Sequence, residues 1–264
     1  MNLIDIHAHL NFPAYEADRA EVIKRTVEAG CGVINIGTDV KTSQEVLALA
    51  QTTPEFWAAV GVHPEIAETG EEIDWEALAL LAAEPQVVAI GECGLDYFQR
   101  GGGSLESGIK ERQRELFERQ ITLAAELGKP LMLHIRESYD DVLAILKLYP
   151  GVRAHAHFFA APWETAKKFL DQGLTLSITG VITFTDQYDE VVKQTPLNSL
   201  LAETDAPYVA PVLYRGKRNE PLYVAEVVKR IATLKNVSPE TVADAMVANA
   251  RRVFALDAPG VAGA

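Results

Sequence analysis

Histidine is the residue type whose placement in this sequence most directly indicates chemistry. The 264-residue chain contains six, which are His7, His9, His63, His134, His155 and His157. We predict that each lies at or just beyond the C-terminal end of a strand. His7 and His9 are two residues apart on one strand, so their side chains share a face. Neutral imidazoles that converge in this way are typical ligands of zinc or a related divalent ion.

Two carboxylates occupy comparable positions. Glu92 follows the apolar run at residues 87–90, and Asp205 lies in the sequence ETDAP at residues 203–207. A pair of adjacent metal ions needs about four nitrogen donors, a bridging carboxylate and an open position for water. We predict that Glu92 is the bridge and that Asp205 binds one metal and accepts a proton from the attacking water. The predicted nitrogen donors are His7, His9, His134 and His157.

The spacing alone does not decide which of His155 and His157 is a metal ligand. His155 and His157 are again two residues apart, so both side chains are expected to point inward. One would be a ligand, and the other would hold the orientation of that ligand.

These residues converge only if the strands that carry them are parallel and adjacent. Helices are predicted at residues 18–29, 110–127 and 163–172, each closed by a glycine and followed by a strand at 32–36, 131–135 and 174–178. Further strands are predicted at 56–61, 86–91, 152–157 and 199–203, and closing helices at 219–231 and 239–254. Ser138 and Asp141 fit a capping box at the start of another helix.

With the strand at the N-terminus, this pattern gives about eight strand–helix units and predicts an α/β fold, a closed (β/α)8 TIM barrel. A doubly wound open sheet is the alternative. In a barrel the C-terminal ends of all strands meet at one mouth, which would gather the histidines and carboxylates. No break in composition divides the chain, so we expect one domain over residues 1–256 and a flexible tail at 257–264.

The composition limits the class of partner. The formal net charge is −13, so we expect no bulk basic face and no tight, sequence-independent binding of duplex DNA. This charge still allows short or single-stranded phosphate substrates to bind in a metal-lined pocket. No apolar run reaches the roughly 18 residues that span a bilayer, and no signal-peptide pattern is present. We expect a cytoplasmic protein, a monomer without an obligate protein partner, and no membrane association.

The ordered motifs resemble those of the TatD-type metal-dependent deoxyribonucleases, a branch of the amidohydrolase-like barrel hydrolases. The matching stretches run from about residue 3 to residue 256. They read DIHAHL at 5–10, GVHP at 61–64, GECGLDY at 91–97, LHIR at 133–136, HFF at 157–159, ETDAP at 203–207 and RGKRNEP at 215–221.

The resemblance implies a two-metal centre. His7 and His9 would bind one metal, His134 and His157 the second, and Glu92 would bridge the two. Asp205 would complete the first site and act as general base. The family pattern His-Cys-Phe selects His157 over His155 as the ligand. His63 is similar to the family histidine that contacts the scissile phosphate, and Arg136, Arg218 and Asn219 look like substrate-side residues.

The resemblance also implies a function, a deoxyribonuclease that cleaves single strands or works from an end through two-metal activation of water, with Mg, Mn or Zn as cofactor. Two departures from the family pattern lie beside a ligand: Phe158 replaces the cysteine, and Ala160-Ala161 replace the usual Ser/Thr-Gly. These replacements favour an alternative function, in which the same metal centre hydrolyses a small phosphoric, carboxylic or aminoacyl ester. A non-catalytic binding module is the third hypothesis, and the complete ligand set argues against it.

Overall fold

In the part of the chain that the structure describes, eight parallel strands form one sheet in which neighbours in the chain are neighbours in space. The computed structural model describes residues 3–99, 103 and 105–256. The strands are β1 (Leu3–Ala8), β2 (Cys31–Ile36), β3 (Phe56–Val60), β4 (Val87–Asp96), β5 (Leu131–Arg136), β6 (Ala154–Ala156), β7 (Thr175–Ile178) and β8 (Leu200–Ala202). The predicted tail at 257–264 lies outside the described residues.

The sheet closes just beyond β8. Ala8 and Ala206 form a parallel bridge, the His9 N–H donates to the Ala206 carbonyl at 2.7 Å, and the Asp205 N–H donates to the His7 carbonyl at 2.9 Å. A closed sheet has no free edge strands, so the predicted TIM barrel is confirmed and the open sheet is excluded. The same bridge sets His7 and Asp205 side by side.

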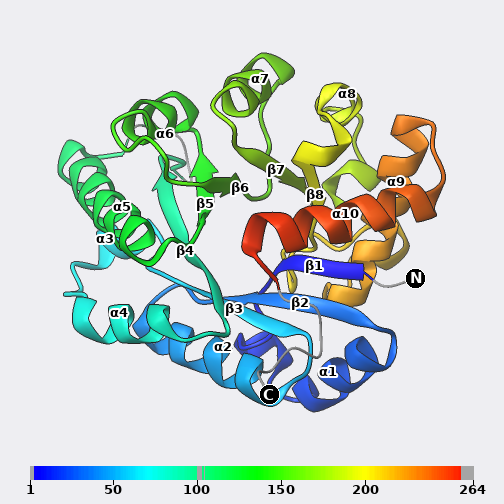
Figure 1. Ribbon diagram of the computed structural model, residues 1–264, viewed down its shortest axis with the longest axis horizontal. Coiled ribbons are helices and arrows are strands. Elements are labelled where there is room, and N and C mark those ends of the chain that lie inside the picture. The colour runs from blue at the N-terminus through cyan, green and yellow to red at the C-terminus, as the bar shows by residue number, and fades with distance from the viewer. Residues whose placement is uncertain (1–2, 100–102, 104, 257–264) are drawn as a thin grey trace.

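Helices surround the barrel (Figure 1). The α-helices are α1 (Arg19–Glu28), α2 (Val40–Thr52), α3 (Ile66–Thr69), α4 (Trp75–Ala83), α5 (Ser107–Leu127), α6 (Tyr139–Leu146), α7 (Trp163–Asp171), α8 (Asp189–Gln194), α9 (Val224–Lys235) and α10 (Pro239–Phe254). Short 3-10 turns are η1 (Pro13–Tyr15), η2 (Gly180–Thr183), η3 (Leu197–Ser199), η4 (Val212–Tyr214) and η5 (Pro221–Tyr223).

Several clusters of buried apolar side chains hold this arrangement together. The largest cluster lies between strands and helices, where for example Phe117 of α5 and Phe169 of α7 are fully buried. A second cluster joins Ile6 and Ile36 of neighbouring strands to Phe254 at the end of α10. Burial of this much apolar surface is the main stabilising term of such a barrel.

Two local predictions were wrong. Ser138 does not cap α6, because its buried hydroxyl donates to the Leu95 carbonyl at 2.6 Å instead. The helix predicted at 219–231 begins at Val224, since Pro221 opens a separate 3-10 turn, and it continues to Lys235. Asn236 ends that helix in the left-handed conformation, with φ 55°.

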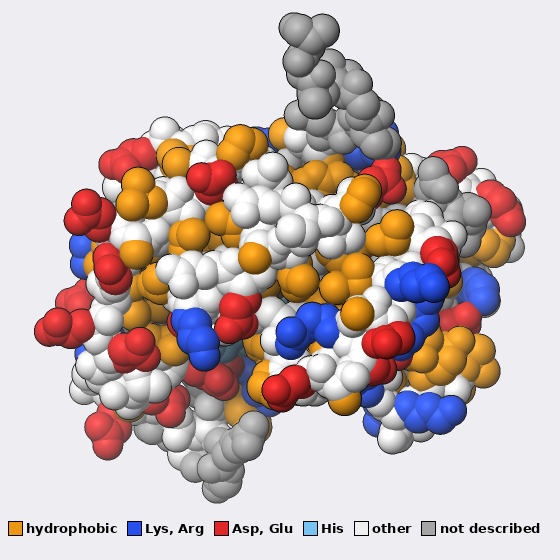
Figure 2. All heavy atoms as spheres, turned by 90° about the horizontal axis from the view of Figure 1, so that it is seen from below, with side chains coloured by type: hydrophobic (Ala, Val, Ile, Leu, Met, Phe, Trp, Pro, Cys, Tyr) orange, Lys and Arg blue, Asp and Glu red, His pale blue; other side chains and the backbone are white. Residues whose placement is uncertain are grey.

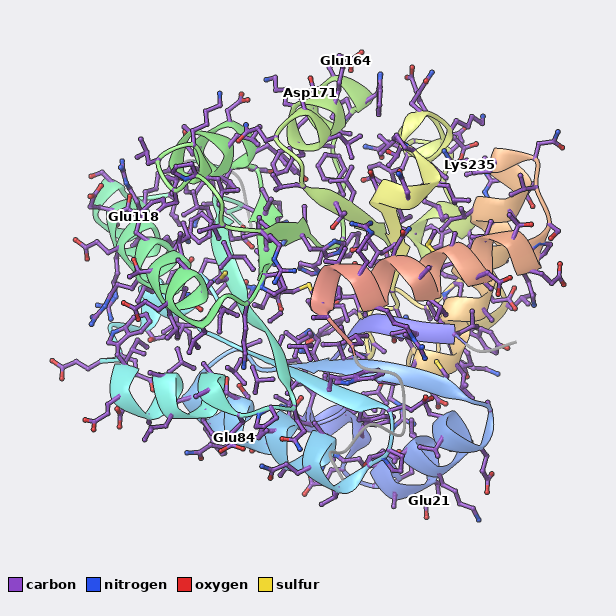
Figure 3. All side chains as sticks on the ribbon, in the orientation of Figure 1. Glu21, Glu84, Glu118, Glu164, Asp171 and Lys235 are labelled. Atoms are coloured by element: carbon purple, nitrogen blue, oxygen red, sulfur yellow. The ribbon has the colours of Figure 1, made fainter. Side chains whose placement is uncertain are left out.

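Charged side chains project outward from the periphery. Figure 3 labels acidic examples on α1, α5 and α7, and Figure 2 shows acidic and basic side chains interspersed over one face. Acidic side chains therefore lie on the outer surface of several of the surrounding helices. Of the described helices, none combines the length and apolarity that crossing a lipid bilayer requires.

Candidate metal centre

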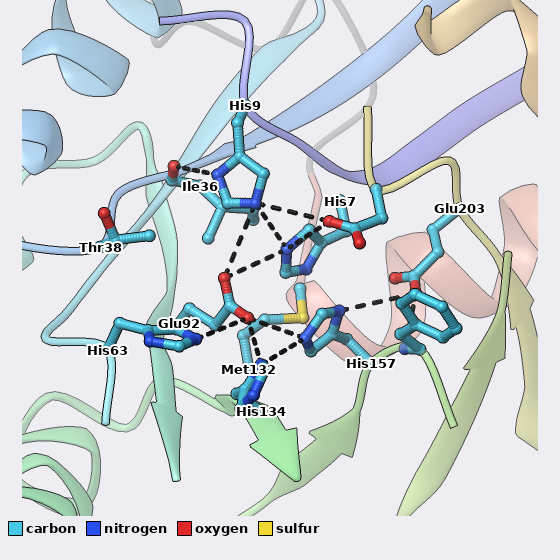
Figure 4. A network of polar contacts seen from close by, with 12 residues as sticks. His7, His9, Ile36, Thr38, His63, Glu92, Met132, His134, His157 and Glu203 are labelled. Carbon is cyan, nitrogen blue, oxygen red and sulfur yellow. Dashed lines mark hydrogen bonds and ion pairs between the residues drawn. The ribbon is translucent and has the colours of Figure 1, made fainter. Parts of the chain in front are cut away.

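Glu92 of β4 lies at the centre of the predicted site, and its two carboxylate oxygens face different histidines (Figure 4). Oε2 is 3.4 Å from His7 Nε2 and 3.7 Å from His9 Nε2. Oε1 is 2.7 Å from His134 Nδ1 and 2.8 Å from His157 Nε2. The side chain is only 4% exposed. One buried carboxylate is thus shared between two groups of nitrogen donors, as a bridging ligand would be.

Glycines beside Glu92 let β4 approach β5 closely. A Cβ atom on Gly91 would lie 2.4 Å from the Met132 carbonyl oxygen, and one on Gly94 would lie 2.1 Å from that of His134. Both glycines also have φ values, +152° and +138°, that other residues rarely adopt. The motif around Glu92 therefore brings its carboxylate within reach of the histidines on β5.

Asp205 completes the first donor group. Its Oδ1 lies 3.6 Å from His9 Nε2 and 3.9 Å from His7 Nε2, and these two nitrogens are 3.2 Å apart. Asp205 has φ 55°, a left-handed conformation that is uncommon for residues other than glycine. The bridge between β1 and the segment that follows β8 holds it in this conformation at the barrel mouth.

Hydrogen bonds on the far side of the rings fix which nitrogen faces the centre. His9 Nδ1 is 3.0 Å from the Ile36 carbonyl, and His134 Nε2 is 2.9 Å from Asp96 Oδ2. A ring nitrogen that donates to such an acceptor leaves a lone pair on the other nitrogen. His9 Nε2 and His134 Nδ1 are therefore the nitrogens that face Glu92 and that would bind a metal ion, an arrangement typical of metal-bound histidine.

The hydrogen bond on the far side of the His63 ring has the opposite direction, because the ring nitrogen accepts it. The Glu65 N–H donates to His63 Nδ1 at 3.2 Å, so the imidazole carries its proton on Nε2. His63 Nε2 lies 3.6 Å from Glu92 Oε1. His63 therefore presents a hydrogen-bond donor to the mouth of the barrel.

His155 and His157 have different contacts in the structure. His157 faces Glu92, whereas His155 lies in the middle of β6, not at its end as expected, because that strand stops at Ala156. The two nitrogens of His155 contact the hydroxyls of Thr175 (2.7 Å) and Ser177 (2.8 Å). Burial lowers the pKa of His155 well below its usual value, which keeps the ring neutral.

A buried polar chain connects the two histidines. The Ser177 hydroxyl donates to Glu203 Oε2 at 3.0 Å, and Glu203 Oε1 lies 3.6 Å from His157 Nδ1. Sequence reasoning assigned no role to Glu203 or to Asp96, although both lie in the quoted motifs. Asp96 supports His134 from behind through a hydrogen bond, whereas Glu203 lies beside His157 and accepts the N–H of Phe158.

Electrostatics match a site for cations. Burial opposes ionisation of Glu92, but His157, His63 and His7 around it hold its pKa well below the usual range. Burial also opposes charge on His134, yet hydrogen bonds to Asp96 and Glu92 raise its pKa to about 9. The negative charge of the ionised carboxylates thus stabilises positive charge at the centre. Protons on the histidines can provide this positive charge, and a bound divalent ion can replace those protons.

The donor set fits divalent metal ions. Ligand atoms of His7, His9 and Glu92 lie within 4.8 Å of one another, and His134 Nδ1 and His157 Nε2 lie 2.7 and 2.8 Å from the other oxygen of Glu92. Mixed imidazole and carboxylate donors suit ions such as zinc or manganese. His7 Nδ1 has no hydrogen-bond partner among the described residues, and its ring stacks on that of His157 with centroids 3.9 Å apart.

The three remaining predicted residues make their contacts with other groups. Arg136 is exposed and stacks over the Phe98 ring at 3.6 Å. Arg218 pairs with Asp18 at 2.6 Å and with Glu220 at 3.3 Å. Asn219 is buried, and its Nδ2 donates to the carbonyls of Thr204 and Tyr208 at 2.9 and 2.6 Å. Asn219 thereby holds the turn that carries Asp205.

Comparison with known proteins gives consistent matches over nearly the whole chain. The family described as TatD related DNase matches residues 4–255. A Bacillus subtilis (strain 168) protein named as the uncharacterized metal-dependent hydrolase YabD is 37% identical, covering 97% of this chain and 100% of that protein. The 3'-5' ssDNA/RNA exonuclease TatD of Citrobacter rodentium (strain ICC168) is 34% identical, covering 96% and 98%.

A solved structure supports the same grouping. The crystal structure of YjjV, a TatD homologue from Escherichia coli K12, has a TM-score of 0.87 and 30% sequence identity, covering 97% of this chain and 98% of that one.

Proposed function

This chain belongs to the TatD-related DNase family, and on that premise we propose that it hydrolyses phosphodiester bonds of DNA, in single strands or from an end. Family membership makes it a metal-dependent hydrolase that acts on ester bonds. The observation that carries the proposal is the Glu92 carboxylate, whose two oxygens face two separate groups of histidines.

We assign the donors to two divalent ions, Mg, Mn or Zn. His7, His9 and Asp205 would hold the first, His134 and His157 the second, and Glu92 both. When bound, such ions lower the pKa of water and neutralise negative charge on phosphoryl oxygens. Asp96 accepts a hydrogen bond from His134 Nε2 and so keeps His134 Nδ1 directed at the centre.

Asp205 is assigned as the general base. Both Glu92 oxygens are engaged by histidines, whereas Asp205 lies at the mouth with Oδ1 toward His9 and no closer histidine contact than 3.6 Å. A carboxylate in this position can accept the proton that water loses as its oxygen bonds to phosphorus, and can return it to the ester oxygen that leaves when its own bond to phosphorus breaks. His63 Nε2–H can donate a hydrogen bond to a phosphate oxygen beside Glu92.

The substrate class follows from charge and from the relatives. Basic side chains are interspersed with acidic ones on the surface, so long duplex DNA finds no continuous basic band on the face drawn in Figure 2. A chain end or single strand needs only to place one phosphate at the centre. The relative from Citrobacter rodentium is named as an exonuclease for single-stranded DNA and RNA.

The test is cleavage of a labelled single-stranded oligonucleotide with Mg²⁺, Mn²⁺ or Zn²⁺, with and without chelator. We expect metal-dependent cleavage by the wild-type protein and a loss of about 100-fold or more in Glu92→Gln, a size typical of removing a central electrostatic group. Glu164→Gln, on the outer surface of α7, is the matched control. Absence of metal-dependent cleavage by wild type, or equal rates for Glu92→Gln, would refute the proposal.

A small-ester substrate is the second candidate. Phe158, with φ 41°, follows His157 directly, and its half-buried ring lies 6.5 Å from the His157 ring. An aromatic side chain there replaces the smaller cysteine of the family pattern beside the second donor group. A panel of small phosphoric, carboxylic and aminoacyl esters, compared with DNA by kcat/KM, distinguishes the two candidates, since a strong preference for an ester would make nuclease action a side reaction.

A further inference from the structure

Aromatic rings lead from the metal centre to solvent on the side of His9. The ring of Phe12 stacks on that of His9, with centroids 4.4 Å apart and planes inclined by 20°. Tyr208 meets Phe12 edge-on, at 6.4 Å and 73°. Tyr208 is 54% exposed although it lies only three residues beyond Asp205. The outermost ring of this series therefore faces solvent beside the proposed general base.

Hydrogen bonds fix the segments that carry both rings. Arg19 donates to the carbonyls of Leu10 at 2.7 Å and Asn11 at 2.8 Å, just before Phe12. The Tyr208 N–H donates to the Asp205 carbonyl at 2.8 Å, and Asn219 holds the Tyr208 carbonyl. An aromatic ring that is fixed before binding loses little conformational entropy when a ligand packs on it.

We propose that Tyr208, supported by Phe12, stacks on the base of the nucleotide next to the bond that is cut. The inference rests on the proposed function and names a binding subsite for it. Every nucleobase has a π face, so such a platform accepts any sequence. Stacking also gives an acidic protein a way to hold a single strand without many phosphate contacts.

The test compares Tyr208→Ala, Tyr208→Phe and wild type on a single-stranded oligonucleotide and on a series in which one nucleotide at a time is abasic. We expect Tyr208→Ala to raise KM about tenfold with kcat within about twofold, because stacking acts on bound substrate before and during reaction. Tyr208→Phe keeps the ring and is expected to behave as wild type. Leu213→Ala, an exposed apolar side chain of η4, is the matched control and should leave KM unchanged.

The abasic series supplies an independent measurement. One abasic position should raise the wild-type KM about tenfold, and the same position should have no further effect in Tyr208→Ala. If wild type tolerates loss of the base at every position, or if Tyr208→Ala has the wild-type KM, the stacking proposal is overturned while cleavage itself still stands. If wild type cleaves no oligonucleotide, the proposed function fails first and the subsite with it. The wild-type series tests the subsite even if the alanine variant misfolds.

Discussion

The carboxylate of Asp5 accepts hydrogen bonds from both the backbone N–H and the hydroxyl of Thr204. The first bond is 2.9 Å long, and the same Asp5 oxygen also accepts the His7 N–H at 3.3 Å. This fully buried contact joins residues 199 positions apart in the chain. It ties β1 to the segment that follows β8, and thereby fixes His7 relative to Asp205.

Removal of this contact is predicted to destabilise the barrel closure. Asp5→Ala leaves buried donors unpaired, each at a cost of about 1–3 kcal/mol, so we expect a loss of roughly 2–4 kcal/mol in the free energy of unfolding. Urea denaturation of Asp5→Ala, Thr204→Ala and the double variant measures it. The two losses should not add, because the variants remove the same interaction. Full additivity would contradict a direct role for the pair.

Asp96 is predicted to act through His134. Asp96→Asn replaces the carboxylate that orients the His134 ring, and we expect metal affinity to fall by about 10- to 100-fold with the fold preserved. Metal titration, followed by heat release and by the shift in Tm, measures this effect. Asp186→Asn, on the exposed surface, is the control. Equal affinities of Asp96→Asn and wild type would show that the contact has no orienting role.

His155 and His157 should respond differently to replacement. His155→Leu removes the partner of the Thr175 hydroxyl and one of the contacts of Ser177, so we expect a loss of about 1–3 kcal/mol in stability but unchanged metal stoichiometry. His157→Ala should remove one of two bound ions. Elemental analysis of both purified variants decides between these assignments. A lost ion in His155→Leu, with none lost in His157→Ala, would reverse them.

Arg218 is predicted to stabilise the fold and to have little effect on substrate binding. Its guanidinium pairs with Asp18 and Glu220, so Arg218→Ala should lower Tm and change KM less than twofold. The hydrogen bond from Arg218 lowers the pKa of Asp18. The Arg218–Asp18 pair thus stabilises the fold above about pH 4, and this stabilisation is lost as acid protonates Asp18. The difference in Tm between Arg218→Ala and wild type should therefore shrink at lower pH. A large KM increase at constant Tm would instead place Arg218 in the substrate path.

Local signals in the sequence explain why the barrel could be predicted. Apolar strands, helices closed by glycine and histidines at strand ends are each visible within a few residues, and the parallel topology follows from their alternation. Positions that depend on contacts between strands were not predictable in this way. Asp96 and Glu203 acquire their roles only from their distances to His134 and His157 in the fold. Ser138 fits a helix cap by spacing, yet its hydroxyl is bonded to the Leu95 carbonyl.

At the rim of the barrel, too, the contacts of individual side chains could not be predicted from the sequence. Arg218 and Asn219 lie in a motif associated with the site, but the fold directs the first toward an ion pair with Asp18 and the second toward backbone carbonyls. Both contacts join parts of the chain that are distant in sequence or belong to an irregular loop. Periodicity carries no information about such loops.

The central claim is that one carboxylate, that of Glu92, serves two metal ions. The most direct measurement is the number and affinity of divalent ions bound per chain in wild type and Glu92→Gln, by elemental analysis and calorimetric titration, with Glu164→Gln as control. We predict two ions per wild-type chain and weakened binding of both in Glu92→Gln. Two ions bound by Glu92→Gln with wild-type affinity would contradict this claim.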